Sequence, residues 1–147
     1  MTVLSRLFAS RDEFRQVAAL PLRRAPDGTL LVGLVTSRDT GRWIPPKGWP
    51  KAGKAAHVVA AEEAREEGGL VGRIEEQPGG IYHYRKKLHF FASVTCAVDV
   101  YFLHDVEQLA TWPEQRERRV GFFPPEEAAS LVAEPELAEI IRNLATA

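Results

Sequence analysis

A proline- and glycine-rich stretch followed directly by a helix-forming stretch constrains the fold of this chain more than any other feature. Residues 45–54 contain three prolines and two glycines, which exclude a helix or regular sheet over this stretch. Residues 55–67 are strong helix formers apart from one histidine and two valines, and Gly68-Gly69 supplies a C-terminal stop. We therefore predict a stiffened loop that leads straight into a helix of about three to four turns.

Apolar and β-branched runs on both sides of this loop and helix predict strands. Residues 17–24 and 29–36 flank Pro26-Asp27-Gly28, a turn signal that predicts a hairpin. Residues 70–76, 80–86 and 88–103 read as later strands, and the last is nearly continuously apolar, as expected of a central strand. A short strand over 116–123 and helices over 125–132 and 135–144 complete the chain. The order predicts an α/β fold, and the length predicts a single domain over residues 1–147.

Composition bears on the compartment and on the class of partner. The chain carries 19 basic and 20 acidic side chains, so its net charge indicates no particular partner. Cys96 is the only cysteine, which excludes an intrachain disulfide and suits a reducing compartment. No apolar stretch approaches the roughly 20 residues that span a bilayer, the opening residues lack a signal core, and Asp12 and Glu13 argue against an organelle transit peptide. We expect a soluble, cytoplasmic protein that does not bind a membrane.

Four acids gather in the second half of the predicted helix, namely Glu62, Glu63, Glu66 and Glu67. The last three share one face because they stand at i, i+3 and i+4. Each like-charge pair four residues apart costs about 0.2–0.5 kcal/mol, and the helix dipole disfavours negative charge at this end. A divalent cation such as Mg²⁺ or Mn²⁺ turns the repulsion into attraction, so the cluster is a candidate metal site. The alternative is a solvated charged face relieved by Arg65.

The loop and the helix together resemble the Nudix box. In that motif a glycine, five residues, a glutamate and seven residues precede Arg-Glu-aliphatic-any-Glu-Glu-any-Gly-aliphatic. Two positions depart, with Lys54 in place of the glutamate and Glu62 in place of the arginine. The surrounding strands and helices also follow the Nudix order, which implies a Nudix-type α/β/α sandwich with a mixed β-sheet, the box loop-helix and C-terminal helices. The matching residues are Gly48, Glu63, Ala64, Glu66, Glu67, Gly69 and Leu70.

The resemblance implies a pyrophosphohydrolase that cleaves a phosphoanhydride bond in an X-linked diphosphate with Mg²⁺ or Mn²⁺. By resemblance, Glu63 and Glu67 are metal ligands, and Glu66 is a ligand or the base that deprotonates water. Clustered carboxylates with a metal neutralise phosphate charge and present water in line. Gly48 lets the backbone approach a phosphate closely. Glu63 and Glu66 are therefore the catalytic candidates.

Residues 36–48 are similar to the diphosphoinositol polyphosphate and diadenosine polyphosphate branch of the family. This resemblance makes Arg38 and Lys47 phosphate contacts, and the arginine fork and the lysine point charge both suit that role. A second basic group follows, in which strand alternation sends Arg85, Lys87 and His89 to one face. That face suits a small-molecule polyphosphate or the 5′ triphosphate end of an RNA. A strand edge charged against aggregation is the structural alternative.

Three further expectations concern an additional acid, the two departures from the motif, and the choice between an enzyme and a binding module. Nudix enzymes often use an additional acid, for which Glu114 and Glu117 are candidates; the alternative is an exposed loop acid. Lys54 and Glu62 exchange the usual charges, so we predict an ion pair of reversed polarity, against the alternative of two unrelated surface substitutions. The retained helix carboxylates favour an enzyme over a non-catalytic module that binds a phosphorylated ligand or a protein, because such a module does not need a self-repelling cluster.

Overall fold

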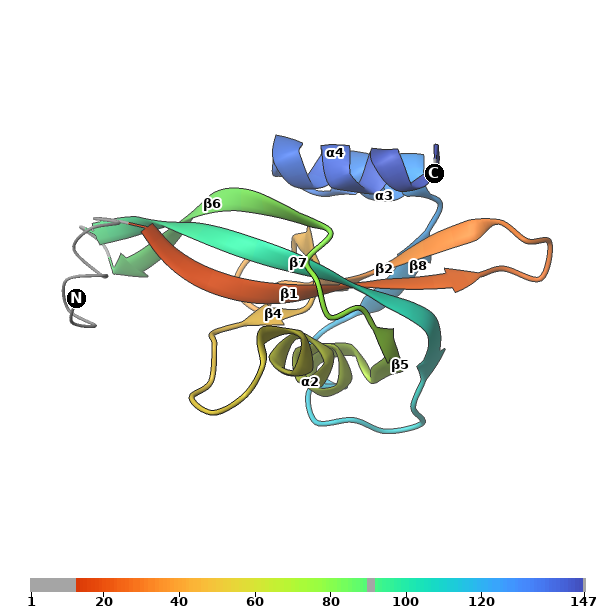
Figure 1. The fold of residues 1–147 in the computed structure, drawn as a ribbon, viewed down its shortest axis with the longest axis horizontal. Helices are drawn as coiled ribbons and strands as arrows, with labels where there is room; N and C mark the ends of the chain where they lie inside the picture. The colour runs from red at the N-terminus through yellow and green to blue at the C-terminus, as the bar shows by residue number, and fades with distance from the viewer. Residues whose placement is uncertain (1–12, 90–91, 147) are drawn as a thin grey trace.

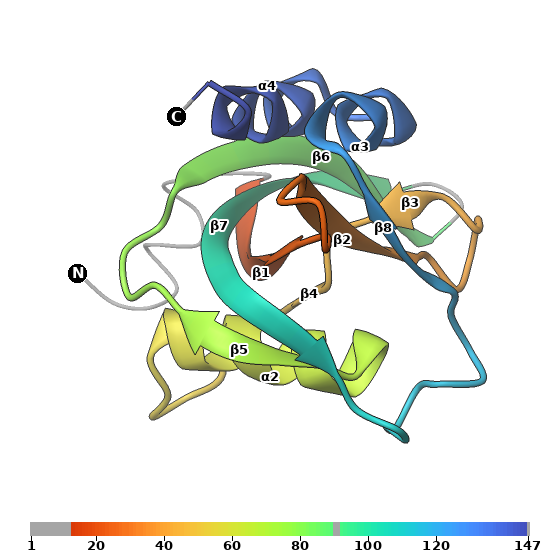
Figure 2. The same cartoon turned by 90° about the vertical axis from the view of Figure 1, so that its right-hand side faces the viewer.

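A mixed β-sheet between two helical layers forms the framework of the molecule (Figure 1). The computed structural model describes residues 13–89 and 92–146. Helix α2 (Ala56–Gly68) covers one face of the sheet, and α3 (Pro125–Leu131) and α4 (Pro135–Leu144) cover the other (Figure 2). This arrangement confirms the predicted α/β/α sandwich. Within the described part of the chain, no helix has the length and apolar character that a membrane span requires.

Strand β7 (Ala92–Gln108) is the centre of the sheet, as its continuous apolar character predicts. It pairs in parallel with β1 (Glu13–Arg24) and antiparallel with β5 (Leu70–Ile74) and β6 (Gly80–His89). The strand curves strongly as it passes from β6 to β5 (Figure 2). Because β7 pairs with three strands, it connects β1 and its neighbours to β5 and β6.

The predicted hairpin joins β1 to β2 (Leu30–Thr36). Gly28 has a φ of 89° in the turn, and the Asp27 carboxylate accepts a hydrogen bond of 2.9 Å from the Thr29 amide. Strand β2 also pairs with β3 (Trp43–Ile44) and β8 (Val120–Phe123). The segment that precedes β8 is therefore placed at the end of β2.

Several predicted boundaries are wrong. Strand β1 begins at Glu13 rather than at residue 17, β5 ends at Ile74 rather than at residue 76, and β7 runs to Gln108 rather than to residue 103. Strands β1 and β7 continue through polar residues because pairing with neighbouring strands, and not an apolar pattern, sets their ends.

Strand β4 (Lys47–Gly48) lies within the stretch expected to exclude regular sheet, and it pairs with β1. A strand of two residues fits between Pro46 and Pro50. Proline lacks an amide donor, but the Pro46 carbonyl can still accept a hydrogen bond of 3.0 Å from the Ala19 amide. Leu88 and His89 belong to β6 rather than to the long strand, since an apolar pattern alone does not mark where one strand ends. Strand β8 begins at Val120 and not at residue 116, because turns occupy the preceding residues.

The core has two parts, one on each face of the sheet. Along β1, Val17 and Ala19 are buried on the face of the sheet that α2 covers, whereas Ala18 and Leu20 are buried against the C-terminal helices. This alternation follows from the two-residue period of a strand. The α2 side also includes Val59, Ala60, Ala64 and Leu70. These contacts fix the rotation of α2 and so determine which of its acids face the sheet.

Candidate active site

Gly48 is the point at which the loop meets helix α2. A Cβ atom at this position would lie 2.5 Å from both Cδ and Oε1 of Glu63. Strand pairing with Val17 and Ala18 holds the loop in place, so the loop backbone does not readily move away. Only glycine lets the Glu63 carboxylate rest against the loop.

The C-terminal end of α2 is tied to the segment that follows β7. Gly69 adopts the left-handed conformation, with a φ of 66°, and Trp112 packs against it so closely that a Cβ there would lie 2.3 Å from the indole. The Glu114 amide donates a 3.0 Å hydrogen bond to the carbonyl of Glu66. These contacts bring Glu114, an acid distant in sequence, to the acidic end of the helix.

Glu67 is a carboxylate buried among other acids, and only 4% of its surface is exposed. Burial raises the pKa of Glu67 to about 8, and a hydrogen bond with Glu63 and the charge of Glu114 act in the same direction, against the lowering effect of Arg118. Ionising this carboxyl group in the folded protein is therefore unfavourable, because the positive charge nearby does not balance the surrounding acids. A cation at this position would relieve the imbalance.

Arg118 organises the same region and was not singled out from the sequence. Only 9% of its side chain is exposed; Nε donates to Glu114 Oε1 at 2.9 Å, and Nη1 donates to the Thr36 carbonyl at 3.1 Å. Its Nη2 lies 3.9 Å from Glu67 Oε1. The sequence offers only Arg116-Glu117-Arg118-Arg119, in which nothing distinguishes Arg118 from the other two arginines.

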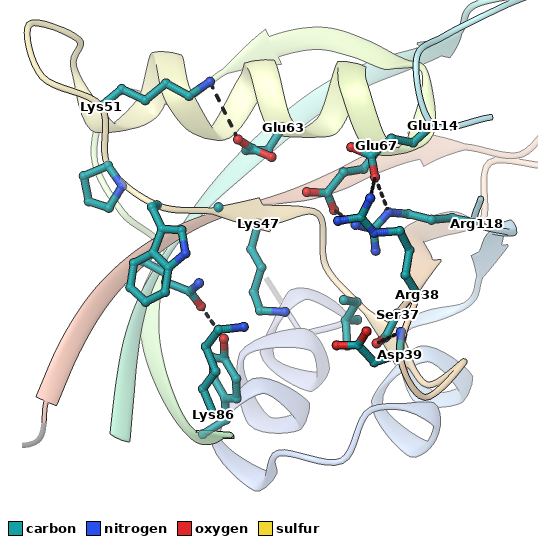
Figure 3. A pocket seen from close by; sticks show the side chains of 16 residues that line it. Ser37, Arg38, Asp39, Lys47, Lys51, Glu63, Glu67, Lys86, Glu114 and Arg118 are labelled. Carbon is teal, nitrogen blue, oxygen red and sulfur yellow. Dashed lines mark hydrogen bonds and ion pairs between the residues drawn. The ribbon is translucent and has the colours of Figure 1, made fainter. Parts of the chain in front are cut away.

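A cavity of about 440 Å³ opens in front of these groups. Figure 3 shows Glu63 and Glu67 beneath α2, with Lys47 and Lys86 on the side of the opening away from the helix. The cavity has the size of a small-molecule site, and its charge is divided into an acidic and a basic part. The charged residues that line it include Lys47, Glu63, Glu67, Lys86, Glu114 and Arg118.

Lys47 supplies the inner positive charge of the basic part. Desolvation by burial lowers its pKa, and its Nζ lies 5.1 Å from the centroid of the Tyr84 ring. Among the described residues, no carboxylate lies within ion-pair distance of this ammonium group. A poorly solvated cation that faces a cavity is suited to hold an anionic group of a ligand.

The other predicted phosphate contacts are distributed over two neighbouring cavities. Arg38 lines the main cavity, where its Nη1 lies 3.1 Å from Glu117 and 3.8 Å from Glu114. Arg85 and Lys87 line an adjoining cavity of about 360 Å³, which shares Lys47 and Lys86 with the first.

Strand β6 places its basic side chains differently from the prediction. Tyr84 and Lys86 face the main cavity, whereas Arg85 is exposed and donates to Thr95 Oγ1 at 3.0 Å and Ser93 Oγ at 2.7 Å. A register shift between Lys87 and His89 interrupts the alternation that was expected to align them. Lys86 thus joins the site although the sequence pattern favoured its neighbours.

The predicted metal-binding residues lie in two different environments. Glu63 and Glu67 line the cavity, but Glu66 is half-buried and does not. Of the two candidate outer acids, Glu114 lines the cavity, whereas Glu117 is exposed and pairs with Arg38. Within residues 13–89 and 92–146, no three His, Cys, Asp or Glu side chains converge into a ready metal cage. Two carboxylates nevertheless suit Mg²⁺, which usually adds waters and substrate phosphates to one or two protein ligands.

The predicted ion pair of reversed polarity is present. Lys54 Nζ lies 2.7 Å from Glu62 Oε1, and Lys51 Nζ lies 3.3 Å from Glu62 Oε2. The hydrogen bond from Lys54, followed by the one from Lys51, lowers the pKa of Glu62. The loop is therefore held to α2 by charge at Glu62 as well as by the contact at Gly48.

Comparison with known proteins agrees with this architecture. Nudix hydrolase 16, mitochondrial, from Arabidopsis thaliana is 30% identical over 141 residues, which cover 93% of this chain and 78% of the relative. The Ap4A hydrolase of C. elegans, solved as a binary complex, has a TM-score of 0.60 at 17% identity and covers 90% of this chain and 95% of its own. The NUDIX domain of Shewanella oneidensis NrtR, solved with ADP ribose, has a TM-score of 0.60 at 15% identity. The match covers 97% of this chain and 98% of the NrtR domain. No protein-family model matches the chain.

The fold and the site define a hydrolase built on a Nudix-type sandwich. The chain belongs to the Nudix hydrolase family, as its similarity to the Arabidopsis protein establishes. The prediction of a Nudix pyrophosphohydrolase is thereby confirmed at the level of the family. The expected cytoplasmic location stays a prediction, and the Arabidopsis relative is named as mitochondrial.

Proposed function

We propose that this enzyme uses Mg²⁺ or Mn²⁺ to hydrolyse a phosphoanhydride bond in an X-linked diphosphate. The proposed substrates are a diphosphoinositol polyphosphate or a dinucleoside polyphosphate. One observation supports this function above all others: buried Glu67 and its neighbour Glu63 share a cavity with half-buried Lys47. Carboxylates beside a basic wall suit a metal bound to a phosphate chain, because the metal occupies the acidic part and the phosphates extend into the basic part.

The residues take separate roles in this proposal. Glu63 and Glu67 hold the cation, which, when bound, neutralises phosphate charge and activates water. Glu66 is a further ligand or the base that accepts the proton of the water. Glu114 is the additional acid, kept in place by Arg118 at 2.9 Å. Gly48 has no side chain of its own, so its backbone can approach a phosphate closely.

The adjoining basic cavity supports a substrate with more than two phosphates. Arg42, Arg85 and Lys87 line it, and it continues from the main cavity through Lys47 and Lys86. Asp39 is the acidic residue that lines both cavities. A diphosphate alone needs only the part nearest Glu63, whereas a longer phosphate chain or a phosphorylated ring reaches further. The structural likeness to the C. elegans Ap4A hydrolase is compatible with such a substrate.

The function is tested by measuring product release from a substrate panel with Mg²⁺, with Mn²⁺ and with EDTA. The panel contains diphosphoinositol polyphosphates, dinucleoside polyphosphates, ADP-ribose, nucleoside triphosphates and triphosphorylated RNA. We expect cation-dependent hydrolysis, and we expect Gln at Glu63, Glu66 or Glu67 to lower turnover about a hundredfold while the protein stays folded. Near-normal turnover in all three variants contradicts the metal site, and preference for the RNA assigns the enzyme to RNA 5′ ends instead.

The substrate class is tested by charge reversal in the basic part. Lys47→Glu and Arg85→Glu should raise KM more for highly phosphorylated substrates than for ADP-ribose, since such contacts act mainly on binding. Arg23→Glu is a matched control, because Arg23 packs on Phe122, 3.6 Å from its ring centroid, and does not line either cavity. Equal effects on both substrate types at one ionic strength contradict selection by this surface.

A further inference from the structure

The ammonium group of Lys51 lies beside Glu63, a proposed metal ligand. Its Nζ lies 3.8 Å from Glu63 Oε1 and 3.3 Å from Glu62 Oε2. Figure 3 shows the Lys51 side chain extended along α2, with its ammonium group directed at Glu63. Lys54 approaches the other oxygen of Glu62, at 2.7 Å. Of the two lysines, Lys51 lines the main cavity and Lys54 does not.

The loop is shaped to present both lysines to the helix. Gly53 adopts a φ of 77°, and the Lys54 amide donates a 3.2 Å hydrogen bond to the Lys51 carbonyl. This turn brings both side chains to Glu62, whose two oxygens each accept one of them. Glu62 therefore acts as an anchor that fixes Lys51 next to Glu63.

We propose that Lys51 is a resident cation of the active site, positioned by Glu62, that occupies Glu63 until a metal-bound phosphate substrate replaces it. The proposal rests on the proposed function, in which Glu63 binds the metal. A positive charge within 4 Å of a ligand opposes a divalent cation, because the two cations compete for one carboxylate. Lys51 is 40% exposed and has a flexible four-carbon side chain. It can leave Glu63 for a phosphate oxygen without any change in the backbone.

The consequence is a coupling between metal and substrate. The free enzyme holds the metal weakly because Lys51 neutralises Glu63. A phosphate that attracts Lys51 frees the carboxylate and strengthens metal binding. By thermodynamic reciprocity, the metal strengthens phosphate binding by the same factor. The enzyme is then adapted to take up a metal together with its substrate rather than the metal alone.

The test measures Mn²⁺ affinity by electron paramagnetic resonance, with and without methylene bisphosphonate as a pyrophosphate analogue that resists hydrolysis. In the unmodified enzyme, the analogue should tighten Mn²⁺ binding about tenfold more than it does in Lys51→Met. Without the analogue, Lys51→Met should itself bind Mn²⁺ about tenfold more tightly than the unmodified enzyme. Melting temperatures in EDTA establish that each variant is folded.

Lys54→Met is the matched control, because it removes the same charge from the same anchor but outside the cavity. It should change Mn²⁺ affinity less than about threefold. Equal tightening in both lysine variants indicates a general effect of net charge and overturns the proposal, as does unchanged affinity in Lys51→Met. Absence of Mn²⁺ binding in the unmodified enzyme and in both variants, with and without the analogue, overturns the proposed metal site itself.

Discussion

Replacing Gly48 by alanine should damage catalysis far more than stability. The new Cβ would lie 2.5 Å from Cδ and Oε1 of Glu63, whereas ordinary contact begins at 3.4 Å, so the carboxylate must retreat by about 0.9 Å. A shift of this size is large beside the Mg²⁺ to oxygen distance of about 2.0–2.1 Å. Misplacement by about 1 Å costs roughly a hundredfold in rate, which corresponds to about 2.7 kcal/mol in the activation free energy.

The effect on the free energy of unfolding should be small. The Gly48 backbone is not in the left-handed region, so alanine is compatible with it. The lost freedom of the unfolded chain stabilises such a variant by about 0.4–1 kcal/mol, which offsets part of the contact strain. We therefore expect Gly48→Ala to melt within a few degrees of the unmodified enzyme, and to lose kcat/KM for whichever substrate the panel identifies.

Gly80→Ala is the matched control. Its Cβ would lie 2.7 Å from the end of the Ile140 side chain, a comparably close approach that involves no carboxylate. This variant should keep its kcat/KM. A second check uses the Glu63→Gln background, in which Gly48→Ala should cause little further loss if both changes act on one carboxylate. Retention of kcat/KM within threefold in Gly48→Ala, or an equal loss in Gly80→Ala, refutes the reasoning.

Two further predictions concern charge. Lys54→Glu and Glu62→Arg should each lower kcat/KM by about tenfold, because the loop that carries Gly48 loses its tie to α2; the double variant should recover most of the activity, and additive losses would show that the pair does not couple to catalysis. Burial raises the folded-state pKa of Glu67 from 4.5 to about 8, so the metal-free protein retains a proton that the unfolded chain releases between those values, and its stability should fall as pH rises through this window. Thermal melts in EDTA at pH 5 and pH 8 should show this loss, Mn²⁺ should reverse it at pH 8, and Glu67→Gln should lack it; an identical pH profile in Glu67→Gln contradicts the assignment.

Local chemistry accounts for the parts of the fold that the sequence predicts well. Helix α2 begins and ends one residue later than predicted, because the proline-rich loop and Gly69 leave little freedom at its ends. The prolines near the starts of α3 and α4 mark those helices equally well. The end of β6 lacks such a signal: Leu88 continues the apolar run, although it is 52% exposed in the structure.

The site was predicted where one helix determines it and missed where tertiary contacts do. Glu63 and Glu67 are one turn apart, so helical spacing places them together. Arg118 and Glu114 join the site only because Trp112 packs on Gly69 and holds their segment at the end of α2. No local pattern distinguishes Glu114 from Glu117, which faces outward to Arg38. Long-range packing of this kind is not encoded in residue spacing.

The parallel pairing of β1 with β7 has a consequence for how the protein is made. Glu13 pairs with Thr95, and Pro21 pairs with Leu103, so β1 waits for a partner that lies about eighty residues further along the chain. At ordinary rates of translation, this delay lasts roughly 4–16 s. Residues 16–20 are buried in the finished protein, and during synthesis they present an apolar strand with an open edge. Strands β2 and β4 pair with the other edge of β1, so the edge that faces β7 stays open to aggregation until β7 emerges from the ribosome.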